Sequence, residues 1–211
     1  MIIRPAQPED APQAAELILA STGRFGEILF GRGNRARAAT AVAGFFGYPH
    51  NRFSYRLTYL AEIDGQVAGL LLAFPGSQIE RLTMALRTQM RPVLGAWGAL
   101  WMVLYSVPLF FGIETTADEY YVAHLAVSAS FRRQGIGQRL LELAEQQASA
   151  AGLARCSLLV AMDNEPARRL YQRQGYTVVK VMKTPWLQWA GYGPGDERRV
   201  KLLEPLLSLK G

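Results

Sequence analysis

Two arginines and two glycines stand directly before a predicted helix, in "FRRQGIGQRL" at residues 131–140. The start of a helix leaves backbone N–H groups unpaired and carries a partial positive charge. Glycine lets a phosphate approach such groups because no Cβ intervenes, and Arg132 and Arg133 add fixed charge. The pattern is typical of a phosphate-binding turn, although Gly135 and Gly137 are also compatible with a tight turn that binds nothing.

Two other phosphate-binding motifs fit this segment poorly. A nucleotide P-loop would end in Gly-Lys-Ser or Gly-Lys-Thr, and the sequence has no such ending. A dinucleotide fingerprint would need a third glycine at position 140, which is Leu140. Both kinds of nucleotide site are therefore disfavoured.

A strand and a helix would position the turn. Residues 120–130, "YYVAHLAVSAS", are rich in aromatic and β-branched types and apolar on both faces, as in a central strand. Apolar residues then recur at helical spacing from Ile136 to Ala151, and Gly152 suits the helix end. Strict alternation in the strand predicts Tyr121, Ala123, Leu125 and Val127 on one face and Tyr120, Val122, His124 and Ala126 on the other.

A second strand and helix follow. "CSLLVAM" at 156–162 predicts a buried strand, and "DNEPARRLYQRQGY" at 163–176 predicts a helix. Asp163 or Asn164 can cap this helix, and Gly175 suits its end.

The rest of the chain predicts further elements by the same signals. We expect a helix over Ala11–Ala20 capped by Asp10, and a hairpin turn at Asp64-Gly65. The other expected elements are a strand in "IIRPA", a helix in "NRARAATAVAGFF", strands at 52–63, 66–74, 176–182 and 199–203, an irregular stretch at 75–118 and a loop at 184–197.

The turn Arg132-x-x-Gly135-x-Gly137 resembles the pyrophosphate turn of the GNAT superfamily of N-acetyltransferases, and 164–176 resembles the family's Asn-x-x-Ala-x-x-Leu-Tyr-x-x-x-Gly-Phe/Tyr segment. The resemblance covers about residues 2–75 and 119–205. It implies an α/β (α+β) fold, with a mixed, mostly antiparallel sheet and helices on both faces. We expect a single domain over 1–211 with an apolar helical insertion at about 76–118.

The resemblance also implies a site for acetyl-coenzyme A (acetyl-CoA) as co-substrate. The backbone of the strand before the turn would pair with the pantetheine arm, with one amide facing the thioester oxygen. The turn amides would hold the pyrophosphate. The implied binding residues are Leu125, Ala126, Val127, Arg132, Arg133, Gln134, Gly135, Ile136, Gly137, Gln138 and Asn164.

The family's tyrosine acid maps to Tyr171, whose phenol is protonated at neutral pH and could protonate a leaving thiolate. The alternatives are an aromatic packed on the sheet for Tyr171 and a simple helix cap for Asn164. The general base stays open, because the two positions where family members carry a glutamate hold Tyr121 and Leu159. Glu119 lies two residues before Tyr121, so it is the candidate for a water-mediated base, with a solvated rim carboxylate as the alternative.

Composition fits one globular domain, with 211 residues, 50% hydrophobic and 19% charged. A net charge of +6 favours anionic ligands, and coenzyme A (CoA) accounts for some of that bias. The arginines are scattered and no nucleic-acid motif is recognisable, so no nucleic-acid partner is expected.

Cysteine and histidine are scarce. A lone cysteine, Cys156 in an apolar run, predicts a buried inert thiol and suits a reducing cytoplasm. His50 and His124 are too few and isolated for a metal site, so no metal is expected. The opening "MIIRPAQPED" lacks a long apolar run, and we expect no signal peptide.

Residues 93–113 carry no charge and have the length of a transmembrane helix. A single span is excluded by the expected topology, since the strands before and after it should be sheet neighbours. We expect one or two helices, with a stripe of Trp97, Trp101 and Tyr105 at four-residue spacing. The stripe could be a wall or lid over the acceptor site, a surface between two copies of the chain, a shallow membrane contact, or ordinary core.

Together these features predict an N-acetyltransferase that moves an acetyl group from acetyl-CoA to a primary amine. The acceptor is an unidentified small molecule or protein amine, and the expected location is the cytoplasm. The alternative is a non-catalytic domain that binds acyl-CoA and lacks acceptor chemistry.

Overall fold

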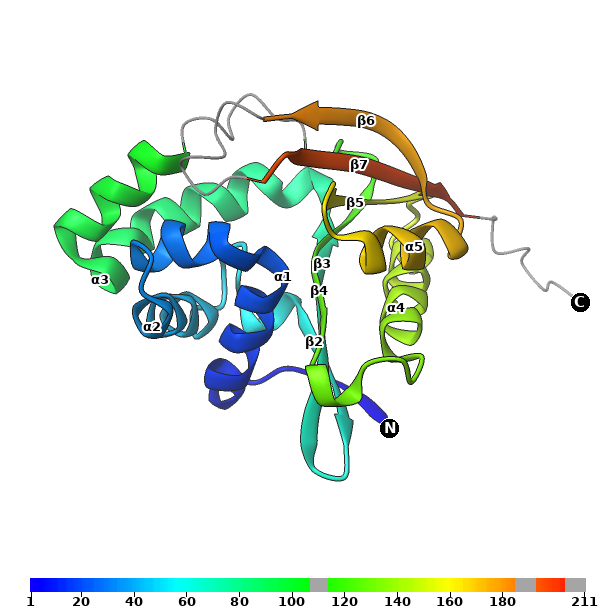
Figure 1. Ribbon diagram of the computed structural model, residues 1–211, viewed down its shortest axis with the longest axis horizontal. Helices are drawn as coiled ribbons and strands as arrows, with labels where there is room; N and C mark the ends of the chain where they lie inside the picture. The colour runs from blue at the N-terminus through cyan, green and yellow to red at the C-terminus, as the bar shows by residue number, and fades with distance from the viewer. Residues whose placement is uncertain (107–113, 185–192, 204–211) are drawn as a thin grey trace, which may run out of the picture.

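The computed structural model describes residues 1–106, 114–184 and 193–203. Its centre is a seven-stranded sheet in the order β1-β2-β3-β4-β5-β7-β6, with helices on both faces (Figure 1). The strands are β1 (Ile2–Pro5), β2 (Thr58–Ile63), β3 (Gln66–Pro75), β4 (Tyr120–Val127), β5 (Arg155–Ala161), β6 (Thr177–Lys183) and β7 (Gly195–Leu202). The helices are α1 (Ala11–Gly31), α2 (Arg35–Phe46), α3 (Ile79–Ser106), α4 (Ile136–Ala150) and α5 (Glu165–Arg173).

The sheet has the predicted mixed, mostly antiparallel character. β4 and β5 pair in parallel, and every other pair of neighbouring strands is antiparallel. One apolar core lies between the sheet and the first three helices, and a second lies under α4 and α5. The expected fold class is therefore confirmed.

Several predicted boundaries were wrong for local reasons. The strand expected at 52–63 begins only at Thr58, because residues before it form a 3₁₀ turn in which Ser54 Oγ accepts from the Arg56 amide. The strand expected at 199–203 begins at Gly195, because its charged residues form ion pairs inside the fold. The Asp64-Gly65 turn was predicted correctly, and both residues have the positive φ that a tight hairpin needs.

The first helix also differs from its prediction. α1 continues to Gly31, past a break at Gly23, where φ is 58° and ψ is −146°. Asp10 stands at its start, but its side chain makes no capping hydrogen bond to α1. The carboxylate instead accepts from the Arg4 guanidinium at 2.8 and 2.9 Å and from the Gln7 amide at 2.7 Å.

A β-bulge changes the faces of β4. Leu72 of β3 pairs with His124 but Ala73 pairs with Val122, which leaves Ala123 as an extra residue. The predicted alternation is therefore wrong beyond Ala123, since one inserted residue moves every later side chain to the other face. Tyr121 and Ala126 belong to the core under the first three helices, and Tyr120, Val122, Leu125 and Val127 face α4.

α3 contains the predicted helical insertion as two helical segments. They meet at Gly95, whose φ of 70° and ψ of 173° are not helical, shortly after Pro92. Residues 107–113 of the uncharged stretch lie outside the described residues. No helix in the described ranges combines the length and apolarity needed to cross a membrane.

The aromatic stripe on α3 is divided between core and surface. Trp101 Nε1 donates to the Ile28 carbonyl at 3.0 Å, and its ring stacks on Tyr105 with centroids 5.5 Å apart. Tyr105 in turn stacks on Phe25 of α1 at 5.8 Å, whereas Trp97 is 76% exposed. Trp101 and Tyr105 are half-buried and pack within the fold, which agrees in part with the core alternative. The acceptor wall, the contact between two copies of the chain and the shallow membrane contact stay predictions.

Trp101→Ala should lower the free energy of unfolding by about 2–4 kcal/mol, because it removes a packed indole and a hydrogen bond. Trp97→Ala on the same helix is the matched control and should change stability by less than about 0.5 kcal/mol. Urea unfolding followed by circular dichroism measures both. Equal effects of the two changes would contradict this division of the stripe.

Candidate functional site

The sheet opens between β4 and β5. These strands pair over Tyr120–Val122 and Cys156–Leu158 only, so among the described residues the rest of β4 has no partner on that side. The gap leads into a cleft of about 2470 Å³. The end of β5, the turn before α4 and helix α5 line one part of the cleft, and α1 and α3 line the other.

The cleft brings together almost all of the predicted binding residues. Gln134 is the one member of the set that does not line it in the described structure. Tyr171, the predicted acid, lines the same cleft. The lining members of the set are Leu125, Ala126, Val127, Arg132, Arg133, Gly135, Ile136, Gly137, Gln138 and Asn164.

The turn before α4 leaves backbone amides available to an anion. Gly135 is the residue that precedes the helix, and its φ of 79° is left-handed, a conformation that favours glycine. With no side chain to accept a hydrogen bond, Gly135 cannot cap the first-turn amides of α4. A phosphate group fits this turn, since it supplies the acceptors that the helix start lacks.

Gly137 has a different reason to be glycine. An added Cβ would lie 3.2 Å from Leu170 Cδ2 of α5, so the residue allows the start of α4 to pack closely on α5. This packing brings Arg169 and Arg173 of α5 to the same cleft as Arg132 and Arg133. The turn therefore lies in a positively charged environment, as its sequence predicts.

The segment 164–176, with Asn164 and Tyr171, lines the same part of the cleft as the turn. Asn164 Oδ1 accepts from the Ala167 amide at 3.3 Å, so Asn164 caps α5, and its contact with pantetheine stays a prediction. The cap uses only the carbonyl oxygen of that side chain. Tyr171 is 6% exposed, its ring centroid lies 6.0 Å from that of Tyr176, and burial raises the pKa of its hydroxyl. The phenol is therefore protonated at neutral pH while it lines the cleft.

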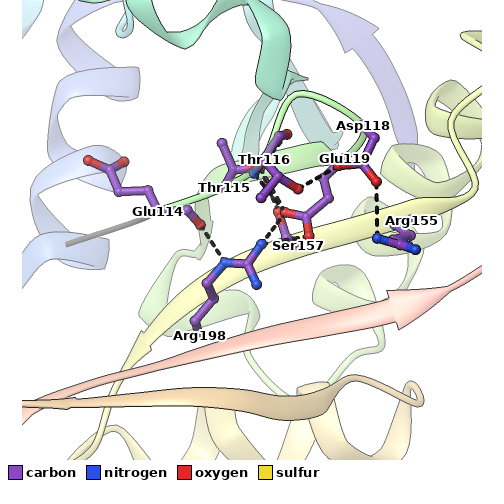
Figure 2. A network of polar contacts seen from close by, with 8 residues as sticks. All are labelled: Glu114, Thr115, Thr116, Asp118, Glu119, Arg155, Ser157 and Arg198. Carbon is purple, nitrogen blue, oxygen red and sulfur yellow. Dashed lines mark hydrogen bonds and ion pairs between the residues drawn. The ribbon is translucent and has the colours of Figure 1, made fainter.

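Glu119 lies in a closed polar network (Figure 2). The side chain is 3% exposed and forms an ion pair with Arg198 of β7, which donates to Oε1 at 2.6 Å. Its Oε2 also accepts from the Thr116 amide at 3.1 Å and from Thr115 Oγ1 at 3.0 Å. The rim alternative was therefore wrong for this carboxylate, because a cation from a distant strand covers it.

Electrostatics agree with this placement. Burial alone would raise the pKa of Glu119, but the hydrogen bond from Arg198 and further donors outweigh burial and hold it below its ordinary value. Glu119 is absent from the described lining of the cleft that holds Tyr171. The structure does not bring the two predicted catalytic residues together. The neighbouring Asp118 is exposed and pairs with Arg155 at 3.0 Å, as a rim carboxylate would.

Other polar residues of the cleft were missed by sequence reasoning. Arg52 forms an ion pair with Glu114, 62 positions away, so no local pattern connects them. Ser21 Oγ lies 2.9 Å from His124 Nδ1, and the imidazole contacts the Phe53 ring in a tilted arrangement, with centroids 5.6 Å apart. Burial lowers the pKa of His124 to about 4, which keeps the ring neutral.

The Acetyltransferase (GNAT) family model matches residues 34–176. The chain belongs to the GNAT acetyltransferase family. Two curated relatives share shorter segments with it. GCN5-related N-acetyltransferase 6, chloroplastic, of Arabidopsis thaliana is 36% identical over 63 residues, 30% of this chain and 22% of that protein. The uncharacterized N-acetyltransferase YdgE of Bacillus subtilis is 30% identical over 81 residues, 38% of this chain and 48% of that protein, so the matches span about a fifth to a half of these relatives.

Solved structures of acetyltransferases resemble the whole fold. An acetyltransferase with 28% identity has a TM-score of 0.72, over 97% of this chain and 100% of that one. An N-acetyltransferase of Staphylococcus aureus Mu50 has a TM-score of 0.67 at 18% identity, over 95% and 100% of the two chains. At that identity the likeness extends to the fold alone.

Glu119→Gln should destabilise the protein by about 3–5 kcal/mol at pH 7, because it leaves the buried Arg198 guanidinium unpaired. The folded pKa of Glu119 is depressed, so the stabilisation is present above the unfolded pKa of about 4.3 and is lost as pH falls. The difference between wild type and variant in urea unfolding should therefore shrink below about pH 4.

Asp118→Asn is the matched control and should change stability by less than about 0.5 kcal/mol. A Glu119→Gln protein as stable as wild type, yet without turnover, would return Glu119 to a catalytic role.

Proposed function

We propose that this GNAT protein transfers the acetyl group of acetyl-CoA to a primary amine. The observation that carries the proposal is one continuous cleft, which joins the uncapped amides at Gly135, the unpaired edge of β4 and the Tyr171 hydroxyl. Membership of the GNAT family supports acetyl transfer in general. The proposal adds two specific points to this general activity, namely acetyl-CoA as the donor and a primary amine as the acceptor.

The binding residues have distinct tasks in this scheme. The amides from Arg133 to Gln138, with the nearby arginines, hold the pyrophosphate. The free backbone edge of Leu125–Val127 pairs with the pantetheine arm, and an amide of this segment meets the developing oxyanion. Acetyl-CoA supplies an activated acetyl thioester when bound. Tyr171 holds a proton for the leaving sulfur.

The acceptor would enter from the α1 and α3 side. This wall of the cleft is largely apolar, with Phe25, Leu29, Phe30, Met90 and Met102 among its residues. We therefore propose an amine with an apolar part. A cytoplasmic setting is proposed as well, since Cys156 is a buried thiol whose pKa burial raises to about 12.

The non-catalytic acyl-CoA binder remains the second candidate, because the Arg198 ion pair occupies the carboxylate of Glu119. Release of CoA thiol separates the two. We expect thiol release from acetyl-CoA with at least one of 2-phenylethylamine, spermidine and a peptide with a free N-terminus. Tight binding of acetyl-CoA without release for any amine would favour the binder.

Gly135→Val should weaken CoA binding about tenfold or more, because a branched side chain would stand where the phosphate approaches. Gly152→Val is the matched control. Both glycines have a left-handed φ, 79° and 71°, both have open space for a Cβ, and they flank the two ends of α4. Isothermal titration of CoA into each variant measures the difference. Equal losses at both positions would mean that backbone strain, not the phosphate site, is responsible.

Tyr171→Phe should lower turnover by up to about 10²–10⁴-fold, the range of general acid–base catalysis, while acetyl-CoA affinity stays within about twofold. The ring still packs and only the proton donor is lost. Tyr176→Phe is the matched control, since Tyr176 contacts the Tyr171 ring but does not line the described cleft. Turnover of Tyr171→Phe within about twofold of wild type would remove the acid role.

A further inference from the structure

Asp196 is a carboxylate of the cleft with no partner. It lies at the start of β7 and lines the cleft, yet its carboxylate makes no hydrogen bond or ion pair within the described residues. The next three residues of β7, Glu197, Arg198 and Arg199, all form ion pairs. A half-buried carboxylate without a cation is costly, and in a chain of net charge +6 its isolation requires a reason.

Strand pairing places Asp196 on the acceptor side of the sheet. Asp196 pairs with Ala161 of β5, so both side chains lie on one face together with Ser157. Ser157 pairs with Tyr121, whose side chain belongs to the core under the first three helices. The carboxylate therefore faces the part of the cleft that α1 and α3 enclose.

The position of Asp196 along β7 also suits a role beside the β4 amides. Ala161 lies three residues beyond the last paired residue of β5, and Leu125 lies three residues beyond the last paired residue of β4. Asp196 is one strand removed from the gap, at the level of the β4 amides proposed to meet the thioester oxygen. An amine that approaches the thioester from the acceptor side would pass this carboxylate.

The surroundings of Asp196 increase the proton affinity of its carboxylate. Burial raises the pKa of its carboxyl, and the negative charges of Asp163 and Glu114 raise it further. Other charged or titratable groups on this side are Tyr121, His124 and Arg52, which pairs with Glu114. The helices α1 and α3 add further ones to the same cleft, namely Arg24, Glu80, Arg87 and Arg91. On β7 itself Arg198 is paired with Glu119, and the neighbour on β6 is the uncharged Met182.

The other candidates for a base are less suitable. His124 is a weak base, because burial lowers its pKa to about 4. Tyr121 keeps its proton, since burial raises the pKa of the phenol well above its ordinary value. Glu119 is held by Arg198 away from the cleft lining. A carboxylate that is unpaired, lines the cleft and has a raised proton affinity is a stronger base than an ordinary aspartate, which suits general base catalysis.

We propose that Asp196 binds the acceptor amine beside the thioester and accepts the proton that the amine releases on attack. This inference rests on the proposed acetyl transfer. In the reaction the amine nitrogen forms a bond to the carbonyl carbon and the carbon–sulfur bond breaks. The nitrogen loses one proton to Asp196, and the sulfur gains one from Tyr171. Solvent carries the proton from Asp196 back to Tyr171, so the sum is thioester plus amine giving amide plus thiol.

Asp196→Asn keeps the shape and removes the base. With whichever of 2-phenylethylamine, spermidine and the peptide the wild type acetylates, kcat/KM should fall about 10²–10⁴-fold, while the Kd for acetyl-CoA stays within about twofold. The rise of kcat/KM with pH that reports deprotonation of Asp196 should disappear in the variant. Asp118→Asn, an exposed carboxylate outside the cleft, is the matched control and should retain wild-type kinetics. If Asp196→Asn keeps kcat/KM within about twofold at every pH, the proposal is overturned.

A second measurement does not need turnover. In protein with ¹³C-labelled aspartate, the carboxyl signal that is missing in Asp196→Asn should titrate above the ordinary value of about 3.9. With CoA bound, it should also shift when 2-phenylethylamine is added. A signal that titrates at or below 3.9, or that ignores the amine, overturns the proposal. A wild type that binds acetyl-CoA but acetylates no amine would contradict the proposed function, and the amine-dependent shift would still decide the role of Asp196.

Discussion

The parting of β4 from β5 is the constraint on which the site depends. Two parallel strands in the middle of a sheet would normally pair along their whole length and leave no edge. Here the pairing stops at Val122 and Leu158, so backbone groups of both strands are exposed inside the molecule. Buried backbone groups need hydrogen-bond partners, and an extended ligand that adds to the β4 edge is one way to supply them. The bulge at Ala123 begins where the strands separate.

A buried ion pair stabilises the sheet beside the region in which β4 and β5 are paired. Glu119, directly before β4, and Arg198 of β7 form a buried pair that spans β5 between them. The same guanidinium donates to the carbonyl of Glu114, which connects the end of the insertion to the sheet. Breaking a buried pair leaves an uncompensated charge, so this contact favours one arrangement of the paired ends. The cleft then opens beyond the paired ends, and residues of α4 and α5 line it.

Sequence patterns predicted the parts of the site that depend on local structure. Gly135 was identified because a helix start and a left-handed turn are both determined by adjacent residues. The same holds for the cap at Asn164 and for Tyr171 on the inward face of α5. These residues reached one cleft because the order of strands and helices was also correct.

The missed features depend on contacts between distant segments. The bulge in β4 follows from pairing with β3 and has no signature in the alternation of apolar residues. Glu119 was predicted as a candidate base or, alternatively, a rim carboxylate, because nothing in the sequence indicates that Arg198, 79 positions later, covers it. Asp196 was placed in a loop, since neither its register against Ala161 nor the burial of the charged residues after it is visible in sequence.

In the proposed complex, one molecule of acetyl-CoA spans the α4 turn and the open edge of β4. Amide hydrogen exchange with and without acetyl-CoA tests it directly. We expect acetyl-CoA to slow amide exchange in two separate segments, Leu125–Val127 and Gly135–Gln138. The exchange rate of the exposed edge strand β6 should stay unchanged. Binding of acetyl-CoA that leaves the exchange of both segments unchanged would contradict it.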